Sequence, residues 1–141
     1  MSYSTILGYA KAAAVLSVVY AGMNIFQVLS GLEDVRRRAA QFRAVATDPE
    51  QAGRLLFIRA LFYLGLPLLY LGTLLGAGIP DIVLFVVGSK LWLSTILGLA
   101  VERRLLRGGE YRPRDHLLSR LDACFNLLMT AMVVLLLLSP A

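Results

Sequence analysis

Apolar residues form four long stretches along the chain, separated by two polar, arginine-rich segments and one short turn. The stretches cover about residues 5–32, 54–77, 82–101 and 117–138. A helix needs about 20 mostly apolar residues to cross the hydrocarbon core of a bilayer. The pattern therefore predicts an all-α fold, a four-span antiparallel transmembrane helix bundle that forms one membrane domain over 1–141.

Polar residues inside the first and last stretches recur at helical spacing. In the first stretch they follow one another at steps of three and four residues: Ser17, Tyr20, Asn24, Gln27 and Gly31. In the last stretch Asp122, Asn126 and Thr130 are four residues apart and share one helix face. Such faces predict seams that pack against other helices, since polar groups in a membrane avoid lipid.

Helix signals also mark the segments between the spans. The apolar residues of 33–53 keep a helical spacing, which predicts an amphipathic helical extension after the first span. Asp48 followed by Pro49 is a typical helix start. Glycine and proline in 76–81 predict a tight turn between the second and third spans, and Asp115 is the predicted cap of the fourth helix.

Composition agrees with a lipid environment. Hydrophobic residues make up 58% of the 141 residues and charged residues 16%, against about 45–50% and about 25% in soluble domains. The net charge of +5 comes from basic residues clustered at 33–54 and 102–116. By the positive-inside rule, the loops 33–53 and 102–116 are cytoplasmic and both termini face outward.

The clustered arginines next to the spans predict contact with lipid headgroups, each worth about 1 kcal/mol. They lack the interleaved aromatic residues of a nucleic-acid site, so we expect no nucleic-acid partner. The predicted headgroup contacts are Arg36, Arg37, Arg38, Arg43, Arg103, Arg104 and Arg107.

Five polar residues inside the spans predict an intramembrane polar core: Asn24, Arg59, Lys90, Asp122 and Asn126. Charged groups at this depth normally face inward and pair, so we expect Asp122 to pair with Arg59 or Lys90. Lys11 and Arg120 lie near enough to the interfaces to snorkel. One positive charge would then remain for a lipid phosphate, a quinone-like or anionic ligand, or the carboxylate of a partner subunit.

Few residues offer cofactor or catalytic chemistry. The single histidine, His116, and the single cysteine, Cys124, provide no haem or metal ligand set. The first residues lack the basic region of a cleavable signal peptide, and no targeting segment is evident, which favours a bacterial inner membrane. We therefore expect lipid as the bound molecule, leave any other cofactor open, and favour a non-enzymatic role.

Four spans, outward termini and an arginine-bearing first cytoplasmic loop resemble the membrane-associated glutathione-transferase and eicosanoid family. That family's second helix starts with Arg-Ala, as Arg59 and Ala60 do here, and continues with an asparagine and a glutamate. Here Tyr63 and apolar residues replace that polar pair. The resemblance implies a trimer that activates glutathione between subunits.

Three functions follow from these patterns. The first is a small accessory or scaffold subunit that binds lipid and packs against a larger membrane complex or against its own copies. The second is a small transporter or channel with an intramembrane site of Asp122, Lys90 and Arg59. The third is a membrane enzyme of the glutathione-handling type.

Overall fold

The computed structural model describes residues 1–46 and 48–139. This part of the chain is helical and contains no strand. Its helices are α1 (Tyr3–Leu29), α2 (Leu32–Val45), α3 (Pro49–Gly76), α4 (Asp81–Leu106) and α5 (Pro113–Leu138). Four of them, all but α2, are long and apolar enough to cross a membrane. Helices α3, α4 and α5 are longer than their predicted spans, and α4 continues five residues beyond its span. Helix α1 ends at Leu29, three residues before the predicted end of the first span.

The helix starts follow the sequence signals. The Asp48 side chain accepts a hydrogen bond from the backbone N–H of Gln51 at 2.8 Å, and Pro49 is the first helical residue of α3. Asp115 caps α5 differently from the prediction, because the helix already begins at Pro113. Its carboxylate reaches back to the N–H of Arg112 at 2.8 Å from the third helical position.

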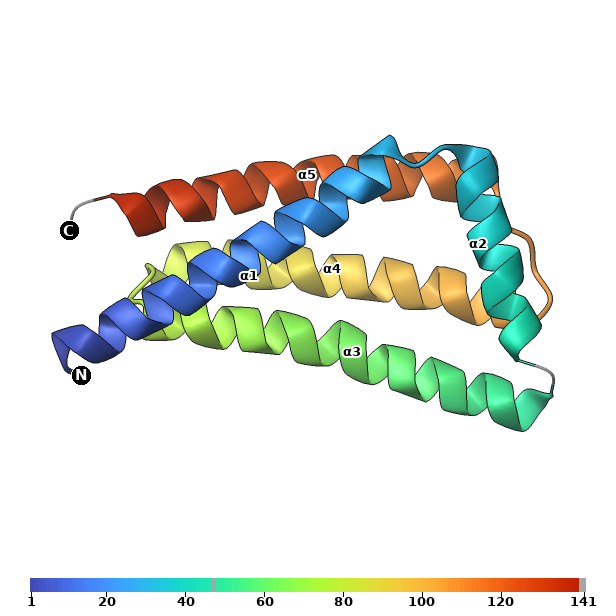
Figure 1. Ribbon diagram of the computed structural model, residues 1–141, viewed down its shortest axis with the longest axis horizontal. Helices are drawn as coiled ribbons and strands as arrows, with labels where there is room; N and C mark the ends of the chain where they lie inside the picture. The colour runs from blue at the N-terminus through green and yellow to red at the C-terminus, as the bar shows by residue number, and fades with distance from the viewer. Residues whose placement is uncertain (47, 140–141) are drawn as a thin grey trace.

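The helical stretch after the first span is a separate helix, which corrects the predicted extension. Ser30 and Gly31 are both extended, with ψ angles of 126° and 158°, and this interrupts the hydrogen-bond ladder between α1 and α2. The break lets α2 turn away from α1. Figure 1 shows α2 running across the ends of the long helices instead of along them.

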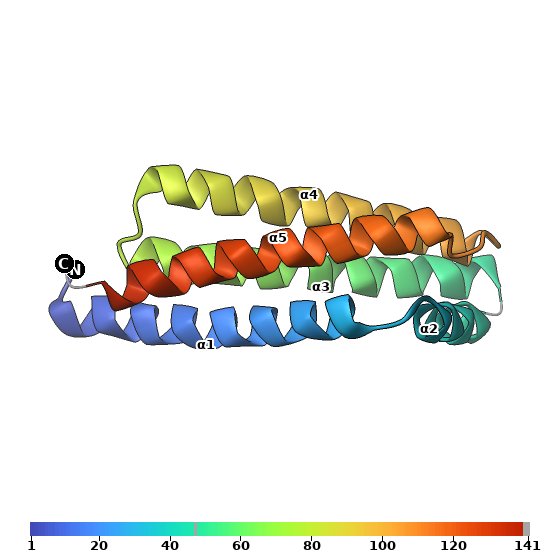
Figure 2. The same cartoon turned by 90° about the horizontal axis from the view of Figure 1, so that it is seen from above.

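The long helices run back and forth along the molecule (Figures 1 and 2). The start of α1, the end of α5 and the turn between α3 and α4 lie at one end of the molecule, and α2 lies at the other. Helix α1 packs along α5 and α3, and α3 packs along α4, whereas α4 and α5 approach each other sparingly.

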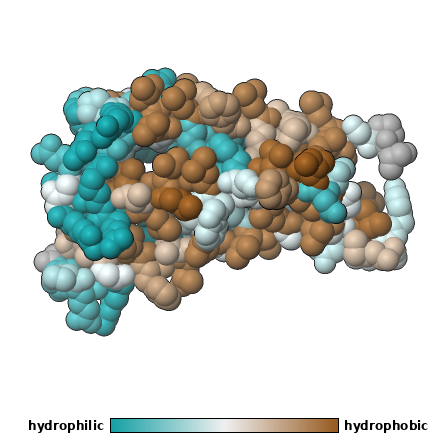
Figure 3. All heavy atoms as spheres, turned by 180° about the vertical axis from the view of Figure 1, so that it is seen from behind, coloured by the Kyte–Doolittle hydropathy of each residue, from teal (hydrophilic) through white to brown (hydrophobic). Residues whose placement is uncertain are grey.

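The apolar core fills the half of the molecule that contains the chain ends. It includes Ala13, Tyr70, Leu74, Val87 and Val133, all fully buried. The polar face predicted for the first span is confirmed for Ser17, Tyr20 and Asn24, which are the residues of α1 buried beside Ala13. Gln27 is half-buried, and Gly31 is exposed and lies after the end of α1. Hydrophobic residues cover most of the surface seen in Figure 3, and hydrophilic residues gather at the end with α2.

Candidate functional site

Lys90 is the centre of a polar cluster that joins α4 to α5. Its ammonium group forms an ion pair with Asp122 and donates hydrogen bonds to Ser94 Oγ and Asn126 Oδ1, both at 2.9 Å. Asn126 Nδ2 donates in turn to Asn24 Oδ1 on α1 at 3.1 Å and to Asp122 Oδ2 at 3.3 Å. Four of the five predicted core residues are therefore in one network, and the predicted pairing of Asp122 with Lys90 is confirmed.

Arg59 has a carboxylate of its own, which corrects the expectation that it shares Asp122 with Lys90. Its guanidinium nitrogen lies 2.5 Å from Glu102 Oε1, and Tyr63 donates to the same oxygen at 3.0 Å. Glu102 is only 9% exposed. The core thus holds two separate ion pairs, and the surplus cation expected among these residues does not exist.

Sequence reasoning missed Glu102 because it assigned residue 102 to a loop. The signal was present: Lys90, Ser94, Gly98 and Glu102 recur every four residues along α4. Each step of four residues turns about 40° around a helix axis, since 3.6 residues complete a turn. The stripe therefore winds from the side facing α5, at Lys90, to the side facing α3, at Glu102.

A third ion pair connects the ends of α4 and α5. Arg104 pairs with Asp115, which is 8% exposed. The sequence had predicted only headgroup contact for Arg104. This pair lies beside the loop that joins the two helices.

The arginines of α2 hold that helix against the same loop. Arg43 donates to the carbonyl of Gly109 at 3.0 Å, and Arg36 donates to the carbonyl of Tyr111 at 3.4 Å. The Arg38 guanidinium lies over the ring of Phe26 at 4.7 Å. Arg37 pairs with Asp34 at 2.8 Å. All four predicted headgroup arginines of α2 therefore have contacts within the protein, while Arg103 and Arg107 on α4 and after it are exposed.

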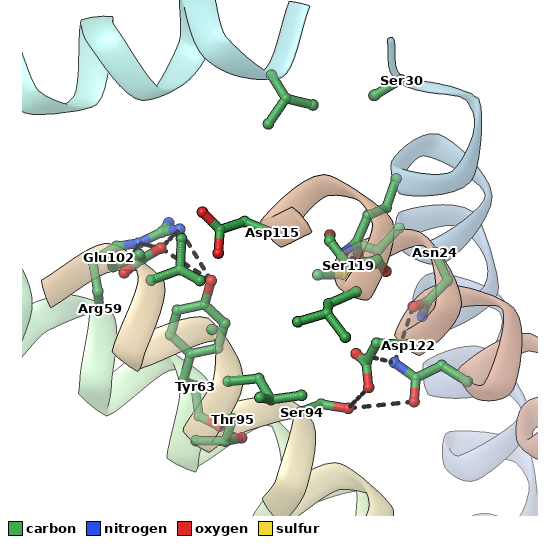
Figure 4. Close-up of a pocket in the computed structure, with 18 of the residues that line it drawn as sticks. Asn24, Ser30, Arg59, Tyr63, Ser94, Thr95, Glu102, Asp115, Ser119 and Asp122 are labelled. Carbon is green, nitrogen blue, oxygen red and sulfur yellow. Dashed lines mark hydrogen bonds and ion pairs between the residues drawn. The ribbon is translucent and has the colours of Figure 1, made fainter. Parts of the chain in front are cut away.

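A cavity of about 610 Å³ separates the two main clusters. It lies between the pair α1 and α5 and the pair α3 and α4, and α2 contributes residues at the end of the bundle. Figure 4 shows Arg59, Glu102 and Tyr63 on one side and Asp122 with Asn24 on the other. The face in Figure 3 is hollowed next to the hydrophilic end.

Most of the remaining cavity wall is apolar, and two further tyrosines, besides Tyr63, border the cavity. Tyr20 is 9% exposed, and its hydroxyl is buried without a hydrogen-bond partner in the described part of the protein. Tyr111 lies in the loop before α5, and burial raises the pKa of its phenol. The hydroxyl therefore stays protonated at neutral pH and can donate a hydrogen bond. The apolar wall includes Phe26, Phe42, Phe62, Leu66, Leu91 and Val101.

No known protein family, no curated protein and no solved structure matches the chain. Within residues 1–46 and 48–139, no three histidine, cysteine, aspartate or glutamate side chains gather as metal ligands would. The fold and the site therefore assign this chain to a broad class of proteins and to no family. It is a small membrane protein with four long apolar helices, and ion pairs between those helices lie beside an apolar core.

Proposed function

We propose that the chain is a small integral membrane accessory or scaffold subunit. Its four long helices form an antiparallel transmembrane bundle with both termini outside and the basic loops in the cytoplasm of a bacterial cell. The excess of arginine on α2 and on the loop between α4 and α5 supports this orientation, because both lie at the same end of the molecule (Figure 2).

The observation that carries the proposal is the internal pairing of the buried charges. Arg59, Lys90 and Arg104 each contact a carboxylate of this chain. Removing one partner of such a pair costs much more than the pair contributes, so paired charges hold helices in one arrangement. A bundle stabilised in this way presents a constant outer surface to lipid and to a neighbouring protein.

Two cations of the spans remain on the outer surface. Lys11 on α1 and Arg120 on α5 are exposed, each about 8 Å from the middle of its helix at 1.5 Å per residue. Both are long enough to snorkel to the nearest interface. They are also available to lipid phosphates or to acidic groups of a neighbouring subunit.

The test is the mass of the particle extracted gently from its native membrane. We expect a particle larger than one 15.4 kDa chain, with an unrelated membrane protein or further copies in fixed ratio. The variants Lys11→Gln and Arg120→Gln should reduce that ratio, whereas Arg37→Gln on the exposed side of α2 should not. A particle that contains one chain and no other protein would contradict the proposal.

A second candidate, a small transporter, is favoured by the cavity with Asp122 in its wall. It predicts that Asp122→Asn abolishes a pH-dependent flux in proteoliposomes and leaves the particle mass unchanged. An accessory subunit predicts the reverse, a lower yield of the assembled particle and no effect on flux. Asp81→Asn, an exposed carboxylate at the start of α4, is the matched control for both measurements.

A further inference from the structure

We propose that the cavity between the two helix pairs is a binding site for a small neutral amphiphile. The ligand would have an apolar chain or ring system and an uncharged head with both hydroxyl donors and acceptors, as in a monoacylglycerol. This inference does not depend on the accessory role, since a subunit of either proposed kind could hold such a molecule.

The size and lining of the cavity support a ligand of this type. Small-molecule sites are typically about 300–1,000 Å³ and mostly apolar, with a few polar groups that orient the ligand, and this cavity is about 610 Å³. Its apolar wall includes Leu66 and Leu91, next to the core. The polar groups lie on the two sides of the cavity, as Figure 4 shows.

The charge pattern favours an uncharged head. The three carboxylates in the cavity wall, Glu102, Asp115 and Asp122, each have a cation of this chain as partner. A charged head beside Asp122 would have to compete with one of these pairs and leave the displaced charge without a partner, which is costly at low dielectric. Arg38 of α2 also lines the cavity and contacts the ring of Phe26 instead of a carboxylate, so an anionic head at that end is the alternative that the decanoate competition tests. A hydroxyl group can instead share the pairs' remaining hydrogen-bonding capacity.

Specific atoms are available to such a head. Asp122 Oδ2 accepts only the 3.3 Å bond from Asn126 among the hydrogen bonds of the described residues, and a carboxylate oxygen can accept two. The buried hydroxyl of Tyr20 lacks a partner and belongs to a residue of the cavity wall. A buried polar group without a hydrogen bond costs about 1–3 kcal/mol. The Tyr20 hydroxyl has almost no accessible surface, so a ligand gains this hydrogen bond when the ring turns toward the cavity.

The seam between α4 and α5 offers a route from the membrane. These helices pack sparingly and are joined by two ion pairs, Lys90 with Asp122 and Arg104 with Asp115. Between these pairs the seam borders the cavity through residues such as Leu97 and Leu118, which are 40% and 47% exposed. An amphiphile dissolved in the bilayer can therefore approach the cavity from the side.

The experiment uses the whole chain in phosphatidylcholine nanodiscs and a monodecanoylglycerol with a diazirine at the end of its acyl chain. After illumination, the labelled residues are located by peptide mass spectrometry. We expect saturable labelling of one probe per chain at residues of the apolar wall, Leu66 and Leu91 among them. Unlabelled monodecanoylglycerol should compete at least tenfold better than decanoate or decylamine.

Matched variants locate the site independently of the label position. Val101→Trp narrows the cavity and should reduce labelling at least tenfold, whereas Ile96→Trp, on the outer face of the same helix, should not. Tyr20→Phe should weaken competition about fivefold through the lost hydrogen bond, and the exposed Tyr3→Phe should have no effect.

Three results would overturn the inference. One is labelling that is confined to outward-facing residues such as Ile96 and Phe125. Another is equal competition by the charged decyl compounds, which would refute the argument from charge. The third is a folded Val101→Trp protein that labels as the wild type does. If that variant does not fold, the labelled positions and the competition series still decide the question.

Discussion

Replacing Asp122 with asparagine should test how much the central ion pair stabilises the bundle. The side chains of Lys90 and Asp122 are 19% and 16% exposed, so the pair is mostly removed from lipid and water. The substitution keeps the shape of the side chain and removes its charge. Lys90 then has only neutral acceptors: Ser94 Oγ and Asn126 Oδ1, each at 2.9 Å, and the amide oxygen of the new asparagine.

The expected magnitude follows from these contacts. Removing one partner of a buried ion pair costs about 3–5 kcal/mol in soluble proteins. Polar interactions inside a membrane protein couple by about 0.6 kcal/mol on average and about 1.7 at most. Because Lys90 keeps two hydrogen bonds and the pair borders a cavity, we expect Asp122→Asn to lower the free energy of unfolding by about 2 kcal/mol.

A double-mutant cycle separates the pair from its surroundings. Lys90→Met alone should also cost about 2 kcal/mol, because it leaves the carboxylate without its cation. The double variant should cost no more than either single one, which gives a coupling of about 2 kcal/mol. Unfolding is measured by titration with sodium dodecyl sulfate in mixed micelles, followed through the single tryptophan, Trp92.

Asp81→Asn is the matched control, since Asp81 is exposed in the first turn of α4. Its effect should stay within about 0.5 kcal/mol. The reasoning is refuted if Asp122→Asn is as stable as the control, or if the effects of the two core substitutions simply add. Either result would mean that the ion pair does not hold α4 against α5.

The same unfolding measurement checks two more predictions about the packing of α3 against α4. Glu102→Gln should lower the free energy of unfolding by about 1 kcal/mol, which is below the usual 1.5–3 kcal/mol for a charged hydrogen bond because the arginine partner is 40% exposed. The surface variant Glu50→Gln should lower it by at most about 0.5 kcal/mol. Equal effects of the two variants would argue against a buried pair. Gly98→Ala would place a Cβ 3.3 Å from the ring of Tyr63 and should cost about 1 kcal/mol. The control is Gly72→Ala, whose new Cβ meets nothing within 4 Å, and it should stabilise α3 by up to about 1 kcal/mol. If Gly98→Ala were stabilising as well, the Tyr63 ring would have moved aside without cost, which would contradict the prediction.

Local sequence patterns were sufficient to predict the long helices and several of their buried faces. Hydrophobic length and helical spacing act within one helix, so Ser17, Tyr20 and Asn24 could be assigned to a buried seam before any neighbour was known. The pairing of Lys90 with Asp122 could also be anticipated, because few charges were available at that depth. The orientation in the membrane and the role as an accessory subunit remain predictions.

Only the tertiary structure could decide the features that depend on how helices end and cross. The partner of Arg59 required α4 to continue to Leu106, so that Glu102 stays helical and rotates toward α3. The break at Ser30 and Gly31 sends α2 across the bundle, and no periodicity within α2 indicates that direction. The cavity arises because α4 and α5 pack sparingly. A gap between helices is a property of their arrangement in space, since it depends on distances between segments that local spacing does not encode.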